Sequence, residues 1–268
     1  MSLSHEQRES LGLALYRAMR DGATLPPLTD THPGIEIEDA YHISRAMLSH
    51  RIEGDGECVV GKKIGVTSSA VQEMLGVYQP DFGFLTDAMA FDNGADIPVA
   101  GSLIQPRAEG EIAFRLKSDL FGTNITEEDV LAATDCIIPC FEIVDSRIDN
   151  WKIKIQDTIA DNASCGVYVL GDSKLSAQDI DLSKLEIHVF KNGEPLSQGT
   201  GAAVQGNPLT AVAWLANTLG AFDIPLLAGE VILSGSVVPL EPVGPGDRMS
   251  LVMFGEGLPE SRCDCQFV

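Results

Sequence analysis

The periodicity of apolar residues changes once along the sequence, near Cys58, and this change limits the folds that the chain can adopt. Before it, residues 4–21 and 36–53 carry apolar side chains at helical spacing. After it, the chain consists mainly of short runs typical of β-strands, at residues 58–66, 103–116, 136–145, 165–171, 185–196, 230–236 and 247–254. Because these strands do not alternate regularly with helices, we expect an α+β fold rather than a doubly wound sheet. The division predicts an N-terminal helical region at residues 1–57 and a β-rich domain at residues 58–268.

Local signals place further elements inside the β-rich part. The pair Asn192-Gly193 lies between two β-rich runs and predicts a tight hairpin turn. Helices are expected near residues 69–76, at residues 126–133 and from Asn207, where Asn-Pro has the pattern of an N-cap followed by the first helical residue. The helix at 126–133 opens with a capping-box pattern.

Composition and charge restrict the partners. With 268 residues, 44% of them hydrophobic, the chain can bury a sizeable core. Its 18 Lys and Arg against 39 Asp and Glu give a formal net charge of -21, which opposes attraction to nucleic acid and to anionic membranes. The first residues lack the pattern of a signal peptide, and no run of about 18 apolar residues occurs. We therefore expect a cytoplasmic protein with neither nucleic-acid nor membrane partners.

Several familiar motifs are absent. Residues 56–62 fit the Gly-x-x-x-x-Gly-Lys pattern of a phosphate-binding loop, but Lys63 follows where Ser or Thr should bind magnesium. The six cysteines lack paired Cys-x-x-Cys spacing and are expected to be reduced thiols rather than zinc ligands (positions 58, 136, 140, 165, 263 and 265). The five histidines lie outside the segments considered below, so neither a Ser-His-Asp triad nor a histidine metal site is supported.

The run QPRAEGEIAF, residues 105–114, places two glutamates two positions apart. In a strand, Arg107, Glu109 and Glu111 share one face, and the small and apolar residues share the other. Carboxylates that originate about 6.5 to 7 Å apart repel by roughly 2 to 3 kcal/mol at an effective dielectric of about 20. The strand is therefore either an ordinary one with a solvated polar face or part of a divalent-metal site that needs a third ligand.

A third carboxylate, Glu142, interrupts the apolar run at residues 136–145. An ionised glutamate in such surroundings costs several kcal/mol unless it is paired or coordinated. Pairing with Arg147 or Arg107 is one explanation. The other is a site in which Glu109, Glu111 and Glu142 hold Mg2+ or Mn2+, the hard ions that oxygen ligands suit.

Six segments carry a resemblance to a known family, at residues 61–68 (GKKIGVTS), 78–89, 105–114, 139–148, 153–166 and 229–243. Together they resemble the 2-oxopent-4-enoate hydratases, also called 2-hydroxypenta-2,4-dienoate hydratases, of the fumarylacetoacetate hydrolase superfamily. The resemblance extends from about residue 39 to residue 247 and is weakest in the first thirty residues and the cysteine-bearing tail. It implies a fumarylacetoacetate hydrolase C-terminal-like fold, a mixed β-roll or sandwich with a small helical N-terminal region, and makes residues 58–268 the catalytic domain.

The resemblance also implies site residues. Glu109, Glu111 and Glu142 match the metal ligands of the family, and Lys63, Asp81 and Ser164 would line the substrate pocket and take part in catalysis. The residues themselves leave alternatives open. By alternation only one of Lys62 and Lys63 faces the interior, and either could do so. Asp81 could be a turn residue after Pro80, and Ser164 a loop serine that bonds backbone.

The implied activity is hydration of 2-hydroxypenta-2,4-dienoate to 4-hydroxy-2-oxopentanoate in meta-cleavage aromatic catabolism, with Asp81 or Glu109 as general base. Lys62-Lys63 before Ile64 favours the hydratases over the 2-oxo-3-hexenedioate (4-oxalocrotonate) decarboxylases, which are the nearest alternative. A non-catalytic assembly subunit of a hydratase-decarboxylase complex is an alternative of another class. The family further implies a homo-oligomer, pentamer or decamer, and a complex with a decarboxylase or aldolase of the same pathway.

Overall fold

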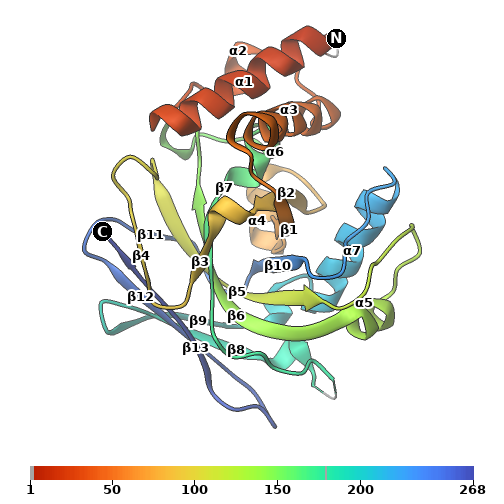
Figure 1. Ribbon diagram of the computed structural model, residues 1–268, viewed down its shortest axis with the longest axis vertical. Coiled ribbons are helices and arrows are strands. Elements are labelled where there is room, and N and C mark those ends of the chain that lie inside the picture. Colours follow the sequence, from red (N-terminus) through yellow and green to blue (C-terminus); the bar gives the residue numbers. More distant parts are fainter. Residues whose placement is uncertain (1–2, 179) are drawn as a thin grey trace.

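Two β-sheets and a layer of helices make up the structure, a computed structural model that describes residues 3–178 and 180–268 (Figure 1). The helices are α1 (His5–Asp21), α2 (Leu28–Thr31), α3 (Ile37–Asp55), α4 (Ser69–Leu75), α5 (Glu127–Ala133), α6 (Ile155–Ala160) and α7 (Pro208–Gly220). The strands are β1 (Val59–Gly65), β2 (Asp81–Thr86), β3 (Ala90–Asp92), β4 (Ala95–Ile97), β5 (Pro106–Leu116), β6 (Thr134–Asp145), β7 (Cys165–Leu170), β8 (Glu186–Lys191), β9 (Glu194–Thr200), β10 (Val231–Ser236), β11 (Glu241–Pro242), β12 (Arg248–Phe254) and β13 (Ser261–Phe267).

The larger sheet has the order β2-β1-β10-β5-β6-β7-β3, with β11 added to β5, and the smaller has the order β4-β13-β12-β8-β9. Both sheets are mixed, because β1 runs parallel to β10, β3 to β7 and β4 to β13, whereas the other pairs are antiparallel. The predicted α+β class is therefore confirmed.

The larger sheet is strongly curled (Figure 1). Strands β1 and β6 are separated by β10 and β5, which corresponds to about 14 Å in a flat sheet. Nevertheless, Nζ of Lys63 on β1 lies 3.3 Å from Oε1 of Glu142 on β6. The sheet is therefore a half-barrel whose concave face brings side chains of distant strands together.

The smaller sheet packs against the outer, convex face of this half-barrel. A Cβ atom at Gly110 of β5 would lie 2.9 Å from Cδ1 of Leu251 on β12 and 3.1 Å from Cγ2 of Val189 on β8. Glycine is thus needed at this close approach of the sheets. The main apolar core includes Ile112 and Phe114 of β5 between the sheets and extends to Val212 and Leu215 of α7.

The N-terminal helices form a layer beside the half-barrel. Leu15 of α1 and Ile43 of α3 share an apolar cluster with Ile155 and Ile159, which belong to α6. In the described residues, no helix combines the length and apolarity required to span a bilayer. The division at residues 57 and 58 falls between α3 and β1, and two separate domains stay a prediction.

The element predictions hold where local patterns are strong. The helices expected at 4–21, 36–53, 69–76, 126–133 and after Asn207 correspond to α1, α3, α4, α5 and α7. The hairpin at Asn192-Gly193 joins β8 to β9, and both residues have positive φ. The short elements α2, α6, β2, β3, β4 and β11, and strand β13 in the cysteine-bearing tail, were not predicted.

Candidate active site

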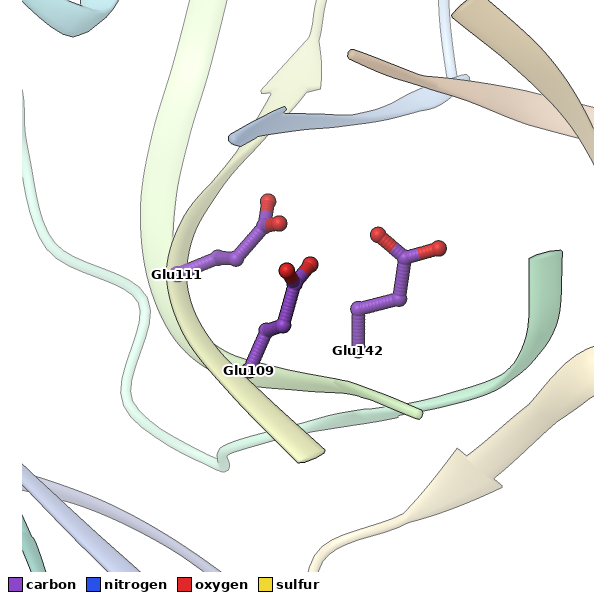
Figure 2. Close-up of side chains that lie close together, drawn as sticks. All are labelled: Glu109, Glu111 and Glu142. Carbon is purple, nitrogen blue, oxygen red and sulfur yellow. The ribbon is translucent and has the colours of Figure 1, made fainter. Parts of the chain in front are cut away.

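The pairing of β5 with β6 brings the three predicted glutamates together. Glu109 lies directly opposite Glu142 in the antiparallel register, and Glu111 follows two residues later on the same face. Figure 2 shows all three side chains pointing into the concave interior of the larger sheet. Each offers a carboxylate oxygen within 4.8 Å of the others. The separation of 31 positions between Glu111 and Glu142 is therefore bridged by one strand pairing.

These carboxylates are not satisfied by the protein around them. Glu111 is completely buried and Glu142 is 1% exposed, whereas Glu109 is partly exposed. Within the described residues, Oε1 of Glu111 and Oε2 of Glu142 have no hydrogen-bond partner, and Oε1 of Glu142 has only the ion pair with Lys63. Burial raises the pKa of all three, to about 8 for Glu142, and repulsion from neighbouring carboxylates, which for Glu109 is that of Asp81, adds to the effect. Such unsatisfied buried oxygens call for a cation.

Lys63 is the cation that the chain itself provides. Its Nζ approaches Oε1 of Glu142, and it is 3% exposed. Burial lowers the pKa of Lys63, but the negative charge of Glu142 and nearby acidic groups outweighs burial, so the pKa is raised overall. Lys62 points to the opposite side of β1, where Nζ bonds both carboxylate oxygens of Glu230 at 2.5 and 2.6 Å. The structure thus places Lys63, and not Lys62, beside the glutamates.

Asp81 is a fourth acid on this face. It begins β2 instead of lying in a turn, and it pairs in register with Gly65 of β1. Its side chain is 1% exposed, and Oδ1 lacks a hydrogen-bond partner among the described residues. Burial raises the pKa of Asp81, while Lys63 lowers it. Four acidic groups, Asp81 and the three glutamates, therefore surround one ammonium group.

Ser164 lies in an unusual turn before β7. Asn162, Ala163 and Ser164 all have left-handed backbone angles, with φ of 54, 51 and 52°. Left-handed conformations are costly for residues other than glycine and are often found at functional sites. The Ser164 hydroxyl lies 3.3 Å from Oδ2 of Asp161 and 3.4 Å from Oγ1 of Thr158. It therefore bonds side chains rather than the backbone expected of a loop serine.

One contact to the glutamates involves a residue that the sequence did not indicate. The backbone N–H of Gly235, on β10, donates to Oε2 of Glu111 at 2.8 Å. Gly235 has φ of 112°, and a Cβ atom there would lie 2.5 Å from the Thr67 side chain. The only sequence signal was a glycine between two serines in an apolar strand run, which is too common to identify a ligand-orienting residue.

The donor set fits a hard divalent cation. Three carboxylates from two rigid, paired strands offer oxygen only, which suits Mg2+ or Mn2+ better than the nitrogen- and sulfur-seeking Zn2+. The orphaned oxygens of Glu111 and Glu142 are those that coordination would satisfy. Neither Arg147 nor Arg107 pairs with Glu142 among the salt bridges of the described residues, so neither explains why a carboxylate is buried there.

A curled mixed sheet with a carboxylate cluster on its concave face defines the class of protein. The fumarylacetoacetate (FAA) hydrolase C-terminal family model matches residues 57–264, and the chain belongs to this family. The resemblance to the superfamily that the sequence motifs indicated is thus confirmed, and so is the predicted fold.

Two known proteins that are similar to this chain in sequence are hydratases. The chain is 60% identical over 260 residues to the 2-hydroxyhexa-2,4-dienoate hydratase of Comamonas testosteroni, covering 97% of each chain. It is 61% identical over 214 residues to the 2-hydroxypent-2,4-dienoate hydratase of Pseudomonas putida, covering 80% of this chain and 96% of the relative. Hydratases are hydro-lyases, the class of enzyme that the sequence predicted.

A solved structure shows the same architecture. The 4-oxalocrotonate decarboxylase from Pseudomonas putida G7, complexed with magnesium and adipate, superposes with a TM-score of 0.93. It is 34% identical, and the match covers 99% of both chains. The two activities weighed from the sequence, hydratase and decarboxylase, therefore both occur among proteins similar to this chain.

Proposed function

We propose that this protein is a metal-dependent hydratase that converts 2-hydroxypenta-2,4-dienoate, or its homologue one carbon longer, to the corresponding 4-hydroxy-2-oxo acid. The observation that carries the proposal is the cluster of three carboxylates beside Lys63, two of which have unsatisfied oxygens. The names of the two hydratase relatives support the choice of reaction.

Glu109, Glu111 and Glu142 would hold Mg2+ or Mn2+. When bound, the ion would act as a Lewis acid for the 2-oxo carboxylate end of the substrate and stabilise negative charge there. The glutamates come from neighbouring strands with fixed register, so the site is rigid before metal arrives. The backbone N–H of Gly235 orients Glu111 for this purpose.

The reaction is balanced by two proton movements and one water. The 2-hydroxyl proton leaves and carbon 5 gains a proton, which converts the dienol to the 2-oxo-3-enoate. Water then adds its hydroxyl to carbon 4 and a proton to carbon 3. Lys63 is placed to stabilise negative charge that develops at the 2-oxygen, because its ammonium group faces the same interior as the glutamates.

Asp81 is our candidate for the group that moves the proton. It is not one of the three proposed ligands, and its Oδ1 is unpartnered in the part of the chain that is described. Burial raises its pKa above the usual range of an aspartate, which favours proton transfer by this carboxyl. Glu109, which is partly exposed, is the alternative, and Ser164 is proposed to line the pocket.

The decarboxylase activity is the second candidate, since the solved decarboxylase matches the whole fold. The deciding experiment offers 2-hydroxypenta-2,4-dienoate and 2-oxo-3-hexenedioate separately to the protein loaded with Mg2+ or Mn2+. We expect the diene absorbance to disappear, 4-hydroxy-2-oxopentanoate to form and no CO2 to be released. Faster turnover of the dicarboxylate with CO2 evolution would make the protein a decarboxylase. No turnover of either would indicate an assembly subunit.

A homo-oligomer is also proposed, on the family resemblance alone. Light scattering at micromolar concentration would test it, and a monomeric mass would show that the prediction is wrong. Association with a decarboxylase or aldolase would appear as co-elution when the proteins are mixed.

A further inference from the structure

The face of β5 that carries the glutamates continues to Arg107. Arg107, Glu109 and Glu111 lie on the same side of the strand, and side-chain exposure is greater at Glu109 and Arg107 than at Glu111. Glu111 is completely buried, whereas Glu109 and Arg107 are partly exposed. Beyond Glu111, Ala113 lies in an apolar cluster that fills the half-barrel. Along this strand the site is therefore closed toward Ala113 and open toward Arg107.

Trp151 holds Arg107 in place. The guanidinium carbon of Arg107 lies 4.8 Å from the Trp151 ring centroid, a cation-π arrangement. The indole Nε1 donates to the carbonyl of Gln105 at 3.0 Å, and the Gln105 side chain in turn donates to the carbonyl of Ser146 at 2.8 Å. Trp151 is thus tied to the start of β5.

The backbone is strained where it presents this indole. Asn150 and Trp151 have φ of 54 and 57°, and a left-handed conformation is rare for a bulky residue such as Trp. Strain of this kind persists only where surrounding contacts determine it, and it clusters at ligand sites. The side chain of the strained Trp151 makes the two contacts that set the indole against Arg107.

Arg107 has no carboxylate partner in residues 3–178 and 180–268. By contrast, Arg51 pairs with Glu57 and Arg147 with Asp161. A guanidinium stacked by its face on an aromatic ring keeps its edge N–H groups free for a planar carboxylate. Arg107 is therefore a partly exposed hydrogen-bond donor, two residues from Glu109 and on the same face of β5.

We propose that Arg107 recruits the anionic substrate at the mouth of the site by donating hydrogen bonds to its carboxylate. The net charge of -21 repels an approaching 2-oxo acid, and the ammonium of Lys63 lies deep in the site, on a residue that is only 3% exposed. A free cation on the open side of the site offsets that repulsion locally. The class of ligand, a 2-oxo or 2-hydroxydienoic acid, rests on the proposed function.

The test measures binding of 2-oxopentanoate, a saturated acid that cannot be hydrated, to the Mg2+-loaded protein by titration calorimetry. Arg107→Gln should bind roughly tenfold more weakly at low salt and lose most of its salt dependence between about 20 and 500 mM NaCl. Arg107→Lys should retain the salt dependence. The matched control is Arg115→Gln, on the same face of β5 but beyond the apolar cluster, and it should bind like the wild type.

Unchanged affinity and salt dependence in Arg107→Gln would overturn the proposal. An equal loss in Arg115→Gln would also overturn it, because the electrostatic field of the whole protein, and not Arg107, would then attract the acid. Circular dichroism of each variant identifies any that does not fold, and Arg107→Lys then decides: it must keep the salt dependence. The proposed function fails separately, if the wild type binds the acid through Arg107 but hydrates no dienoate.

Discussion

Two clusters of buried charge lie near each other in this molecule and differ in how well they are satisfied. In the first, the guanidinium of Arg147 pairs with Asp161 at 2.5 Å and also donates to the carbonyls of Asp161, Cys165 and Asp145. The other carboxylate oxygen of Asp161 accepts from the backbone of Arg147 and faces two serine hydroxyls. This cluster is complete without any ligand.

The second cluster, formed by Asp81, the three glutamates and Lys63, is incomplete. Four carboxyl groups, three of them buried, face one ammonium, and several of their oxygens have no hydrogen-bond partner among the described residues. Removing one of these carboxyl groups should leave the metal-free fold equally stable or more stable. Removing a group from the first cluster should destabilise the fold. Buried charge alone therefore does not indicate function, but buried charge that is not balanced by charge of the opposite sign does.

The largest effect is expected from Glu142→Gln. Loss of one ligand should reduce turnover of the dienoate by about a thousandfold, because electrostatic stabilisation at the reacting end is lost. The variant should still fold, since Asp81 and Glu109 stay near the Lys63 ammonium when a neutral amide replaces the carboxyl of Glu142. Steady-state kinetics with EDTA-treated, Mg2+-reloaded protein measures this, and Glu186→Gln, on β8 of the smaller sheet, is the control. Normal turnover by Glu142→Gln would remove the metal hypothesis.

A second comparison concerns stability without metal. Asp161→Asn should lower the free energy of unfolding by about 3 to 5 kcal/mol, because Arg147 would remain buried without its charged partner. Glu111→Gln should cost less than about 1 kcal/mol or be stabilising, since it removes an ionisable group that burial disfavours. Urea denaturation in EDTA measures both. Equal losses would show that the two clusters do not differ.

The stabilisation by metal should depend on pH. Burial raises the pKa of Glu142 to about 8, above its unfolded value, so the metal-free fold loses stability as pH rises from about 4.5 through 8. Metal must displace the protons that the carboxyl groups bind. It therefore stabilises the fold more at a pH at which these groups are already ionised. Mg2+ at about 100 times its Kd should stabilise by roughly 2.7 kcal/mol, a shift of about 5 to 10 °C in Tm.

Differential scanning calorimetry with and without Mg2+ would follow this shift. The shift in Tm at fixed total Mg2+ should be larger at about pH 8.5 than at about pH 6. A shift that is equal at both pH values would show that the carboxyls do not bind protons in the metal-free protein.

The smallest effect is expected from Ser164→Ala, because Ser164 bonds Asp161 of the complete cluster and is proposed to line the substrate pocket. Loss of one hydrogen bond should cost about 0.5 to 1.5 kcal/mol of stability. If the hydroxyl also contacts substrate, KM should rise several-fold in the same variant. Thr158→Val, which removes the neighbouring hydroxyl, is the control. An unchanged KM would leave Ser164 with a structural role only.

Much of the candidate site could be predicted because its carboxylates interrupt sequence patterns. Glu109, Glu111 and Glu142 stand in apolar or small-residue runs, and a strand period places the first two on one face. The choice between Lys62 and Lys63 could not be made, because alternation gives opposite faces without saying which is inside. That depends on the curl of the sheet across β1, β10, β5 and β6.

Other features depend on tertiary contacts that leave no local pattern. The role of Gly235 depends on the irregular register of β10 against β5. The left-handed turn at Ser164 is held in part by Asn162, whose side chain hydrogen-bonds both backbone groups of Phe84 on β2. Strand β13 pairs with β12 through a run rich in cysteine and charged residues, in which burial alternates but the apolar pattern is weak.

The central claim is that the three glutamates hold one divalent ion. Crystals of the protein soaked in Mn2+ would test it directly through the anomalous difference map. We expect one strong peak on the concave face of the larger sheet, within coordination distance of carboxylate oxygens of Glu109, Glu111 and Glu142. We expect no such peak in Glu142→Gln. A peak elsewhere, or crystals that turn over the dienoate while these carboxylates carry no ion, would contradict it.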